Sequence, residues 1–132
     1  MAESKVKILI VEDNAALASL YAYKFEHEGF AVHTAHNGQT GLEAAKSLQP
    51  DLILLDLKMP VMNGDEMLEK LRETDWGSGM RVIALTNISK DEAPGALRFL
   101  NVDRYIVKAH HTPAQIVDAV RDVLALPRPN IS

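Results

Sequence analysis

Cysteine is absent from this chain of 132 residues. Its absence excludes disulfide bonds, thiolate nucleophiles and zinc sites built from cysteine. Long apolar runs are absent too. The first apolar run, Ile8 to Val11, is far too short for the apolar segment of a signal peptide or for a membrane span. From the sequence we therefore expect a cytoplasmic protein that does not associate with a membrane.

Positive charge is also in short supply. The chain has 14 Lys and Arg residues against 18 Asp and Glu residues, which gives a net charge of −4. Domains that bind nucleic acid directly usually present a surplus of basic side chains to the phosphate backbone. We therefore expect no direct binding to nucleic acid.

What the chain does contain fits one globular domain. Its 47% apolar and 24% charged residues are ordinary for a folded chain of this length with a single core. Pro127 and Pro129 cannot extend the last expected helix. We expect one domain over residues 1–126, followed over residues 127–132 by a C-terminal tail or the start of a linker.

Short apolar runs alternate with amphipathic segments along the chain. The runs predict five strands, which are Lys5 to Val11, Ala31 to Ala35, Leu52 to Leu55, Arg81 to Leu85 and Arg104 to Val107. The amphipathic segments predict five helices. This alternation is typical of an α/β fold in which a doubly wound, five-stranded parallel sheet carries helices on both faces.

Capping signals indicate where several helices begin and end. The first begins after Asp13 or Asn14, and its expected apolar stripe comprises Leu17, Leu20, Tyr21 and Phe25. The fourth is expected within residues 89–100, with its N-cap near Asp91 and with Asn101 as a left-handed C-cap residue. The last begins with a capping box over residues 112–115.

The strand Leu52 to Leu55 ends abruptly in a carboxylate, Asp56. Pro60 and the Asn63-Gly64 pair forbid further strand, so a loop must follow. In open α/β sheets, ligands bind beyond the carboxyl ends of the strands. A strand-ending Asp is also a frequent turn former or helix cap, so this stretch alone leaves both interpretations open.

Other strands end in polar groups at the same edge, namely Glu12 and Asp13, Thr86, and Lys108. Three carboxylates close together cost stability unless a cation neutralises them. Mg²⁺ prefers a few carboxylates, a carbonyl and waters. We expect Asp13 and Asp56 to bind Mg²⁺ directly, Glu12 to bind it through water, and the backbone carbonyl of Lys58 to be a further ligand.

Thr86 and Lys108, the other two residues at this edge, could bind a phosphoryl group. The hydroxyl of Thr86 and the ammonium of Lys108 are donors of the kind that bind phosphoryl oxygens. Asp56, with one oxygen left over, could then act as the nucleophile in phosphoryl transfer. Haloacid-dehalogenase-like phosphatases use similar groups, but they need a second Asp where this chain has Lys58, and their motif lies on the first strand.

The acid pair Glu12-Asp13, the Asp-x-x-Met-Pro-x-x-x-Gly loop from Asp56 to Gly64, Thr86 and Lys108 follow one another in a familiar order. With them the chain resembles a response-regulator receiver domain of two-component signalling, up to about residue 126. The resemblance implies a flavodoxin-like strand order of 2-1-3-4-5. It also implies Mg²⁺-dependent transfer of a phosphoryl group to Asp56 from a histidine kinase or histidine phosphotransfer protein, and slow self-dephosphorylation without other enzyme activity.

The resemblance further implies a switch. In the family an aromatic residue three positions before the lysine turns inward on phosphorylation, together with the strand-ending threonine. Here these residues are Tyr105 and Thr86. The switched surface comprises the fourth helix, the fifth strand and the fifth helix, and it would serve an output domain, a downstream protein or a second copy in a homodimer.

Two positions depart from the family pattern. Asn87 stands where a small residue usually follows the threonine, and Ala109 stands where proline usually follows the lysine. They leave open an alternative, a degenerate receiver that acts only as a protein-binding module.

The replacement of proline by Ala109 also bears on the peptide bond after Lys108. A cis bond before a residue other than proline costs about 2.5–4 kcal/mol. We therefore expect a trans bond between Lys108 and Ala109, with His110 and His111 exposed.

Overall fold

The computed structural model describes residues 5–127 of the chain. Its five strands form one parallel sheet in the order β2-β1-β3-β4-β5, which confirms the expected topology. The strands are β1 (Lys7–Val11), β2 (Ala31–Ala35), β3 (Leu52–Leu55), β4 (Arg81–Thr86) and β5 (Arg104–Val107). The strand order reverses between β1 and β3, and such switch points are where open α/β sheets bind ligands.

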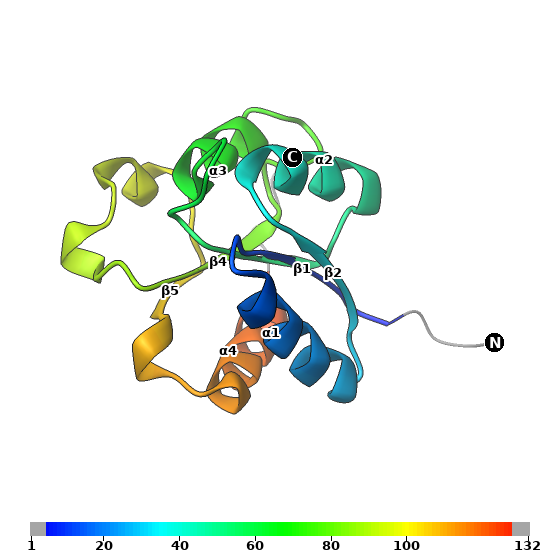
Figure 1. Ribbon diagram of the computed structural model, residues 1–132. Helices are drawn as coiled ribbons and strands as arrows, with labels where there is room; N and C mark the ends of the chain where they lie inside the picture. Colours follow the sequence, from blue (N-terminus) through cyan, green and yellow to red (C-terminus); the bar gives the residue numbers. More distant parts are fainter. Residues whose placement is uncertain (1–4, 128–132) are drawn as a thin grey trace.

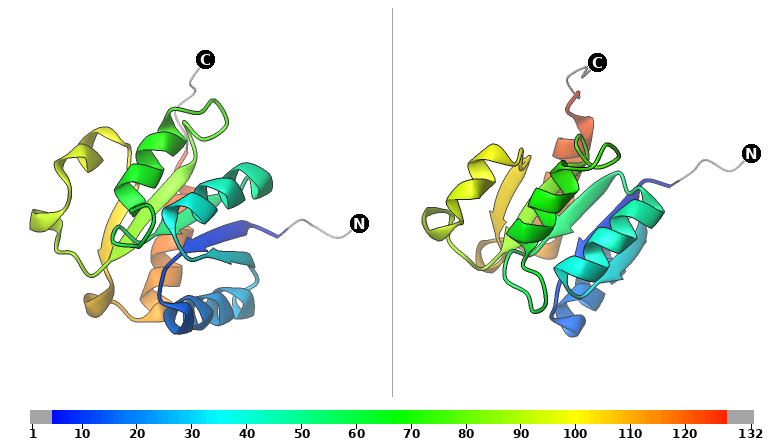
Figure 2. Two further views of the ribbon diagram at one scale, coloured as in Figure 1. Left: turned by 45° about the horizontal axis from the view of Figure 1, so that its top comes forward. Right: turned by 90° about the horizontal axis from the view of Figure 1, so that it is seen from above.

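Helices cover both faces of the sheet (Figure 1). One face carries α1 (Ala15–His27) and α4 (Pro113–Ala125), and the other carries α2 (Gly38–Leu48) and α3 (Gly64–Arg72). Figure 2 shows the two helix pairs on opposite sides of the sheet from two further directions. Because side chains alternate along a strand, Ile8 and Ile10 of β1 join one core, while Leu9 and Val11 join the other.

The central strand β3 is fully enclosed. Each of its four residues is at most 1% exposed, and the strand pairs with β1 on one side and with β4 on the other. Burying a Leu or Ile side chain completely stabilises the fold by about 1.5–3 kcal/mol. This strand therefore gives Asp56, which follows it directly, a rigid support.

The crossover from β4 to β5 differs from the expectation, because the described residues contain four α-helices and not five. Where a helix was expected within residues 89–100, the chain forms two short 3-10 helices, η1 (Lys90–Glu92) and η2 (Gly95–Phe99). Pro94 explains the difference: it has no N–H to donate, and it keeps the preceding Ala93 extended, at ψ 148°. Asn101 has φ 55°, so the expected left-handed residue is confirmed.

Smaller corrections concern the helices. Leu20 was expected in the buried stripe of α1 but is 52% exposed, because the part of α1 that faces the sheet is narrower and centres on Ala18, Tyr21 and Phe25. The capping box at the start of α4 is present as expected.

None of the helices within residues 5–127 has the length and the apolar character that a membrane span requires. Of the expected tail 127–132, residues 128–132 lie outside the described part of the chain.

Candidate functional site at the carboxyl edge of the sheet

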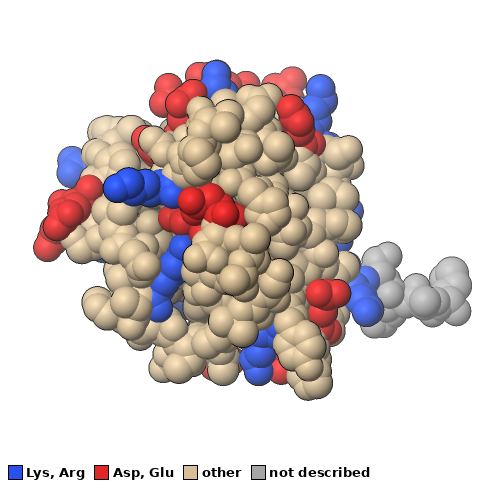
Figure 3. Space-filling view, viewed as in Figure 1, with Lys and Arg blue, Asp and Glu red and all other residues tan. Residues whose placement is uncertain are grey.

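The carboxyl ends of four strands surround an open hollow of about 610 Å³. All five residues that the sequence singled out for this edge line it, namely Glu12, Asp13, Asp56, Thr86 and Lys108. They come from the ends of β1, β3, β4 and β5. Figure 3 shows acidic side chains gathered near the middle of the view, with basic side chains beside them.

The carboxylates form a compact group. One carboxylate oxygen from each of Glu12, Asp13 and Asp56 lies within 4.8 Å of the others. Oxygens bound to one Mg²⁺ at 2.0–2.1 Å in an octahedron lie roughly 3–4 Å apart, and a ligand that acts through water lies farther away. Two direct carboxylate ligands and a third acting through water therefore fit this group.

Burial distinguishes the three acids. Glu12 is 3% exposed and Asp56 is 7% exposed, whereas Asp13 is exposed to solvent. Burial raises the pKa of the Glu12 carboxyl, although hydrogen bonds from Lys108 and from the backbone N–H of Asn14 act in the opposite direction. Asp13 is the acid that an incoming cation reaches most easily.

Lys108 links the two buried acids. Its Nζ donates to Oε1 of Glu12 and, at 2.9 Å, to Oδ2 of Asp56. Burial alone would lower the pKa of the Lys108 ammonium, but the hydrogen bonds to Glu12 and Asp56 outweigh it, so the pKa is raised. Lys108 therefore keeps its positive charge at neutral pH. From the sequence we expect this charge near a phosphoryl group. The hydrogen bond from Lys108 to Asp56 was not predicted.

Asp56 does not cap the helix that follows it. Asn63 is the N-cap residue of α3, and the Asp56 carboxylate instead faces the hollow. The loop returns so closely that a Cβ on Gly64 would collide with the backbone carbonyl of Asp56. The second carboxylate oxygen, Oδ1, accepts only a long hydrogen bond from the N–H of Lys58, at 3.4 Å. Oδ1 is thus the less engaged of the two Asp56 oxygens.

The expected switch residues lie on either side of the β4–β5 crossover. Thr86 is 1% exposed, and its hydroxyl accepts a hydrogen bond from the N–H of Ile88 at 3.4 Å. The hydroxyl of Tyr105 donates to the carbonyl of Ile88 at 2.5 Å. Burial raises the pKa of Tyr105, and the negative charges of Asp56 and Glu92 add to this effect.

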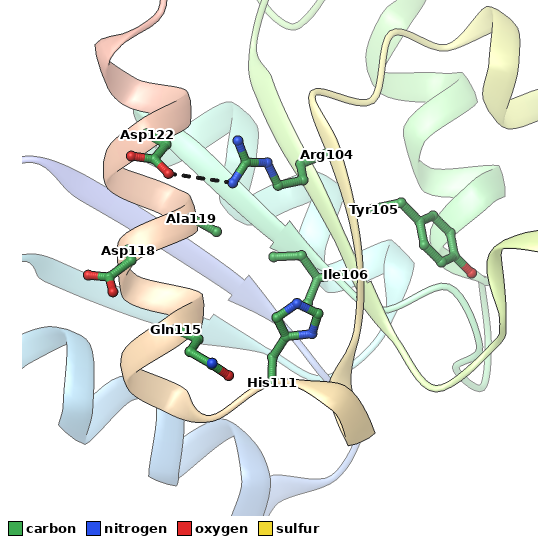
Figure 4. A pocket seen from close by; sticks show the side chains of 8 residues that line it. All are labelled: Arg104, Tyr105, Ile106, His111, Gln115, Asp118, Ala119 and Asp122. Carbon is green, nitrogen blue, oxygen red and sulfur yellow. Dashed lines mark ion pairs between the residues drawn. The ribbon is translucent and has the colours of Figure 1, made fainter.

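Figure 4 shows how β5 distributes its side chains. Arg104 and Ile106 point toward α4, where Arg104 forms an ion pair with Asp122 at 3.7 Å. Tyr105 points to the opposite side of the strand, toward the crossover, as the period of two in a strand predicts. This is the direction expected from the sequence.

Two contacts at the edge were not anticipated from the sequence. The ring Nδ1 of His36 donates to the backbone carbonyl of Glu12 at 3.0 Å. Because His36 follows β2 directly and Ala35 pairs with Val11, the argument from strand ends would have placed it here. The side chain of Asn87 accepts a hydrogen bond from the N–H of Ala109 at 3.2 Å.

Two expectations for the segment after β5 are confirmed. The peptide bonds among the described residues are all trans, including the bond between Lys108 and Ala109. His110 and His111 are exposed.

Comparison with known proteins agrees with the fold and identifies the family. Residues 8–121 match the family model of the response regulator receiver domain. The chain is 36% identical over 128 residues to the uncharacterized transcriptional regulatory protein YkoG of Bacillus subtilis, a match that covers 96% of this chain and 53% of YkoG. It is 30% identical over 118 residues to the chemotaxis protein CheY of Halobacterium salinarum, covering 89% of this chain and 96% of CheY.

A solved structure gives the same result. A CheY-like response regulator receiver domain protein from Methanospirillum hungatei matches with a TM-score of 0.81 and 30% identity, covering 92% of this chain and 94% of that one. The chain thus spans about half the length of YkoG and nearly all of CheY. On these grounds, the chain belongs to the response regulator receiver domain family.

Proposed function

We propose that this receiver domain accepts a phosphoryl group on Asp56 from the phosphorylated histidine of a histidine kinase or a histidine phosphotransfer protein. The observation that carries the proposal is the arrangement around Asp56. Its carboxylate is buried at the switch point of the sheet, contacts the Lys108 ammonium, and lies within 4.8 Å of two further carboxylates.

The transfer step requires little chemistry from the protein beyond positioning and charge. Oδ1 of Asp56 attacks the phosphorus atom, the new bond joins Oδ1 to phosphorus, and the bond from phosphorus to the donor imidazole nitrogen breaks. The electron pair of that bond leaves with the imidazole. The Lys108 ammonium and the Thr86 hydroxyl, which line the same hollow, would donate hydrogen bonds to the phosphoryl oxygens.

The acids would hold Mg²⁺. Asp13 and Asp56 would bind it directly, Glu12 through water, and the Lys58 carbonyl would complete the protein ligands. When bound, Mg²⁺ would neutralise negative charge on the carboxylates and on the phosphoryl oxygens. Three carboxylates and one ammonium leave a formal charge of −2, which one divalent cation balances.

The proposed output is a change at the β4–β5 crossover. Thr86 would turn its hydroxyl toward the phosphoryl group, and Tyr105 would exchange its bond to the Ile88 carbonyl for an inward position. The crossover contains two short 3-10 helices, η1 and η2, in place of the expected α-helix. The altered surface over the crossover, β5 and α4 would then bind an output domain, a downstream protein or a second copy of the chain.

Acetyl phosphate, a small phosphoryl donor, tests the proposal. With Mg²⁺ present, intact mass spectrometry should show one added phosphoryl group on the parent chain and none after removal of Mg²⁺ with a chelator. A folded chain that takes up no phosphoryl group would contradict the proposal and favour a receiver that acts only as a binding module.

A further inference from the structure

We propose that Asn87 is a positioning residue that braces the turn carrying Lys108, and that the brace exists because residue 109 is alanine and not proline. This inference rests on the proposed phosphoryl transfer to Asp56 and adds one residue to that site. Oδ1 of Asn87 accepts a hydrogen bond from the N–H of Ala109 at 3.2 Å. Proline at position 109 would have no N–H to donate. The two residues that depart from the family pattern, Asn87 and Ala109, are thus joined by a hydrogen bond.

The register of the sheet explains why these residues meet. Thr86 pairs with Val107, so the residues that follow them, Asn87 and Lys108, leave the sheet side by side. Lys108 then begins a short 3-10 turn, η3 (Lys108–His110). From its place beside this turn, the Asn87 side chain reaches the first backbone N–H after Lys108.

Two other hydrogen bonds hold the same turn, both made by His111. Its backbone N–H donates to the carbonyl of Lys108 at 3.3 Å, and its ring Nδ1 donates to the carbonyl of Val107 at 3.0 Å. Figure 4 shows this ring beside Ile106, on the α4 side of β5. Both bonds lie within residues 107–111, whereas the Asn87 bond ties the turn to β4.

The brace bears on chemistry because Lys108 has to reach two acids at once. A lysine side chain is long and flexible, so the position of its Cα decides how often the ammonium bridges Glu12 and Asp56. Within residues 5–127, β5 ends the sheet order, with β4 as its one neighbour. A tie from the start of the crossover to the turn after β5 thus limits motion at the end of β5, where Lys108 begins. Asn87 lines the same hollow as Asp56 and Lys108, so the brace is part of the site.

Hydrogen exchange of the Ala109 amide, followed by NMR, tests the bond itself. Asn87→Leu keeps the side-chain size but removes the acceptor, so exchange should become about two- to tenfold faster, which is the range expected for one modest hydrogen bond. Asn87→Asp keeps an oxygen acceptor and should preserve the protection. Equal exchange in the parent and in Asn87→Leu would overturn the proposal.

A double-mutant cycle tests the role in the reaction. Asn87→Leu and Ala109→Pro should each slow phosphoryl uptake from acetyl phosphate by about two- to tenfold, because each removes one partner of the same bond. Ala109→Ser keeps the N–H and is the matched control. The double variant should be no slower than the slower single variant.

Losses that multiply in the double variant would contradict the brace, since they would show that the two residues act independently. If Ala109→Pro fails to fold, the amide exchange of Asn87→Leu and Asn87→Asp decides the question. A parent chain that takes up no phosphoryl group would contradict the proposed function, and the amide exchange would still show whether the brace exists.

Discussion

Nζ of Lys108 lies 2.9 Å from Oδ2 of Asp56, although the two residues are 52 positions apart in the sequence. The same ammonium donates to Glu12, and the side chains of Lys108, Glu12 and Asp56 are each at most 9% exposed. One buried cation therefore compensates two buried carboxylates. The site should therefore depend on the ammonium of Lys108, which is the partner of both carboxylates.

Replacing Lys108 by methionine should destabilise the fold at neutral pH. Removing one partner of a buried ion pair typically costs about 3–5 kcal/mol, because the remaining charge stays buried without compensation. Urea unfolding without Mg²⁺ should show a loss of this order at pH 7. Lys90→Met, at an exposed position in η1, is the matched control and should change stability by less than about 0.5 kcal/mol.

The pH dependence of this loss follows from the two raised pKa values. Since the pKa of Lys108 is raised in the folded state, its contribution to stability is complete below the unfolded value of 10.5 and is lost as the pH rises through the folded pKa. The pKa of the Glu12 carboxyl is also raised in the folded state. Ionisation of Glu12 therefore lowers the stability of the fold as the pH rises from 4.5 through the folded pKa. The difference between parent and Lys108→Met should therefore be largest near neutral pH and shrink toward both extremes. A difference that stays constant from pH 4 to pH 11 would contradict this electrostatic account.

Removing Asp13 should weaken Mg²⁺ binding most directly. The exposed Asp13 carboxylate is a proposed direct ligand, and loss of even an outer-sphere partner typically costs about 10–100-fold in metal affinity. Titration calorimetry should therefore show that Asp13→Ala binds Mg²⁺ about tenfold or more weakly than the parent. Glu69→Ala removes an exposed acid of α3 and should leave the affinity unchanged. Equal affinities in Asp13→Ala and the parent would reject the metal site.

The sequence predicted that the candidate site residues meet, because strand ends in a parallel sheet share one edge. The apolar runs located β1, β3, β4 and β5, and their register then brings Asp56, Thr86 and Lys108 together. What sequence reasoning missed depends on particular backbone and side-chain positions. Pro94 broke the expected fourth helix into 3-10 turns, although a proline in the first helical turn would have been tolerated.

Two further features, the exposure of Leu20 and the hydrogen bond between Asn87 and Ala109, were likewise not predicted from the sequence. The apolar spacing of Leu20 fits a buried stripe, but how wide a face α1 buries depends on how it lies against the sheet. The bond from Asn87 to Ala109 joins residues that follow two different strands, and only their register reveals it. Local pattern carries no signal for such contacts between distant segments.

The phosphorylated form should be long-lived, because the side chains two positions after Asp56 and two positions after Thr86 cannot orient an attacking water. Lys58 and Ile88 lie two positions after Asp56 and Thr86, line the hollow, and offer no carboxylate or amide. Ile88→Glu should shorten the lifetime of the phosphoryl group by about tenfold or more, as expected of a group that assists proton transfer. Ile88→Leu is the control of similar size. The lifetime is measured from the rate at which the phosphoryl mass is lost. An unchanged or longer lifetime in Ile88→Glu would refute this explanation.

Gly64 should tolerate no side chain. A Cβ at this position would collide with the backbone carbonyl of Asp56, whereas a Cβ at Gly79 would meet nothing within 4 Å. Gly64→Ala should therefore destabilise the protein by about 1–3 kcal/mol or more, the usual cost of overpacking, and should also slow phosphoryl uptake by displacing Asp56. Gly79→Ala is the matched control, and thermal unfolding compares the two. Comparable melting temperatures for both variants would show that the loop has room to move.

The central claim, that Asp56 is the phosphoacceptor, can be tested by locating the phosphoryl group chemically. After incubation with acetyl phosphate and Mg²⁺, borohydride reduces an aspartyl phosphate to homoserine, and peptide mass spectrometry identifies the converted residue. The control Asp56→Asn removes the nucleophile and relieves the crowding of negative charge, so its melting temperature without Mg²⁺ should equal or exceed that of the parent. We predict homoserine at position 56 in the parent and none in Asp56→Asn. Homoserine at any other position, or phosphoryl uptake by Asp56→Asn equal to that of the parent, would contradict the account.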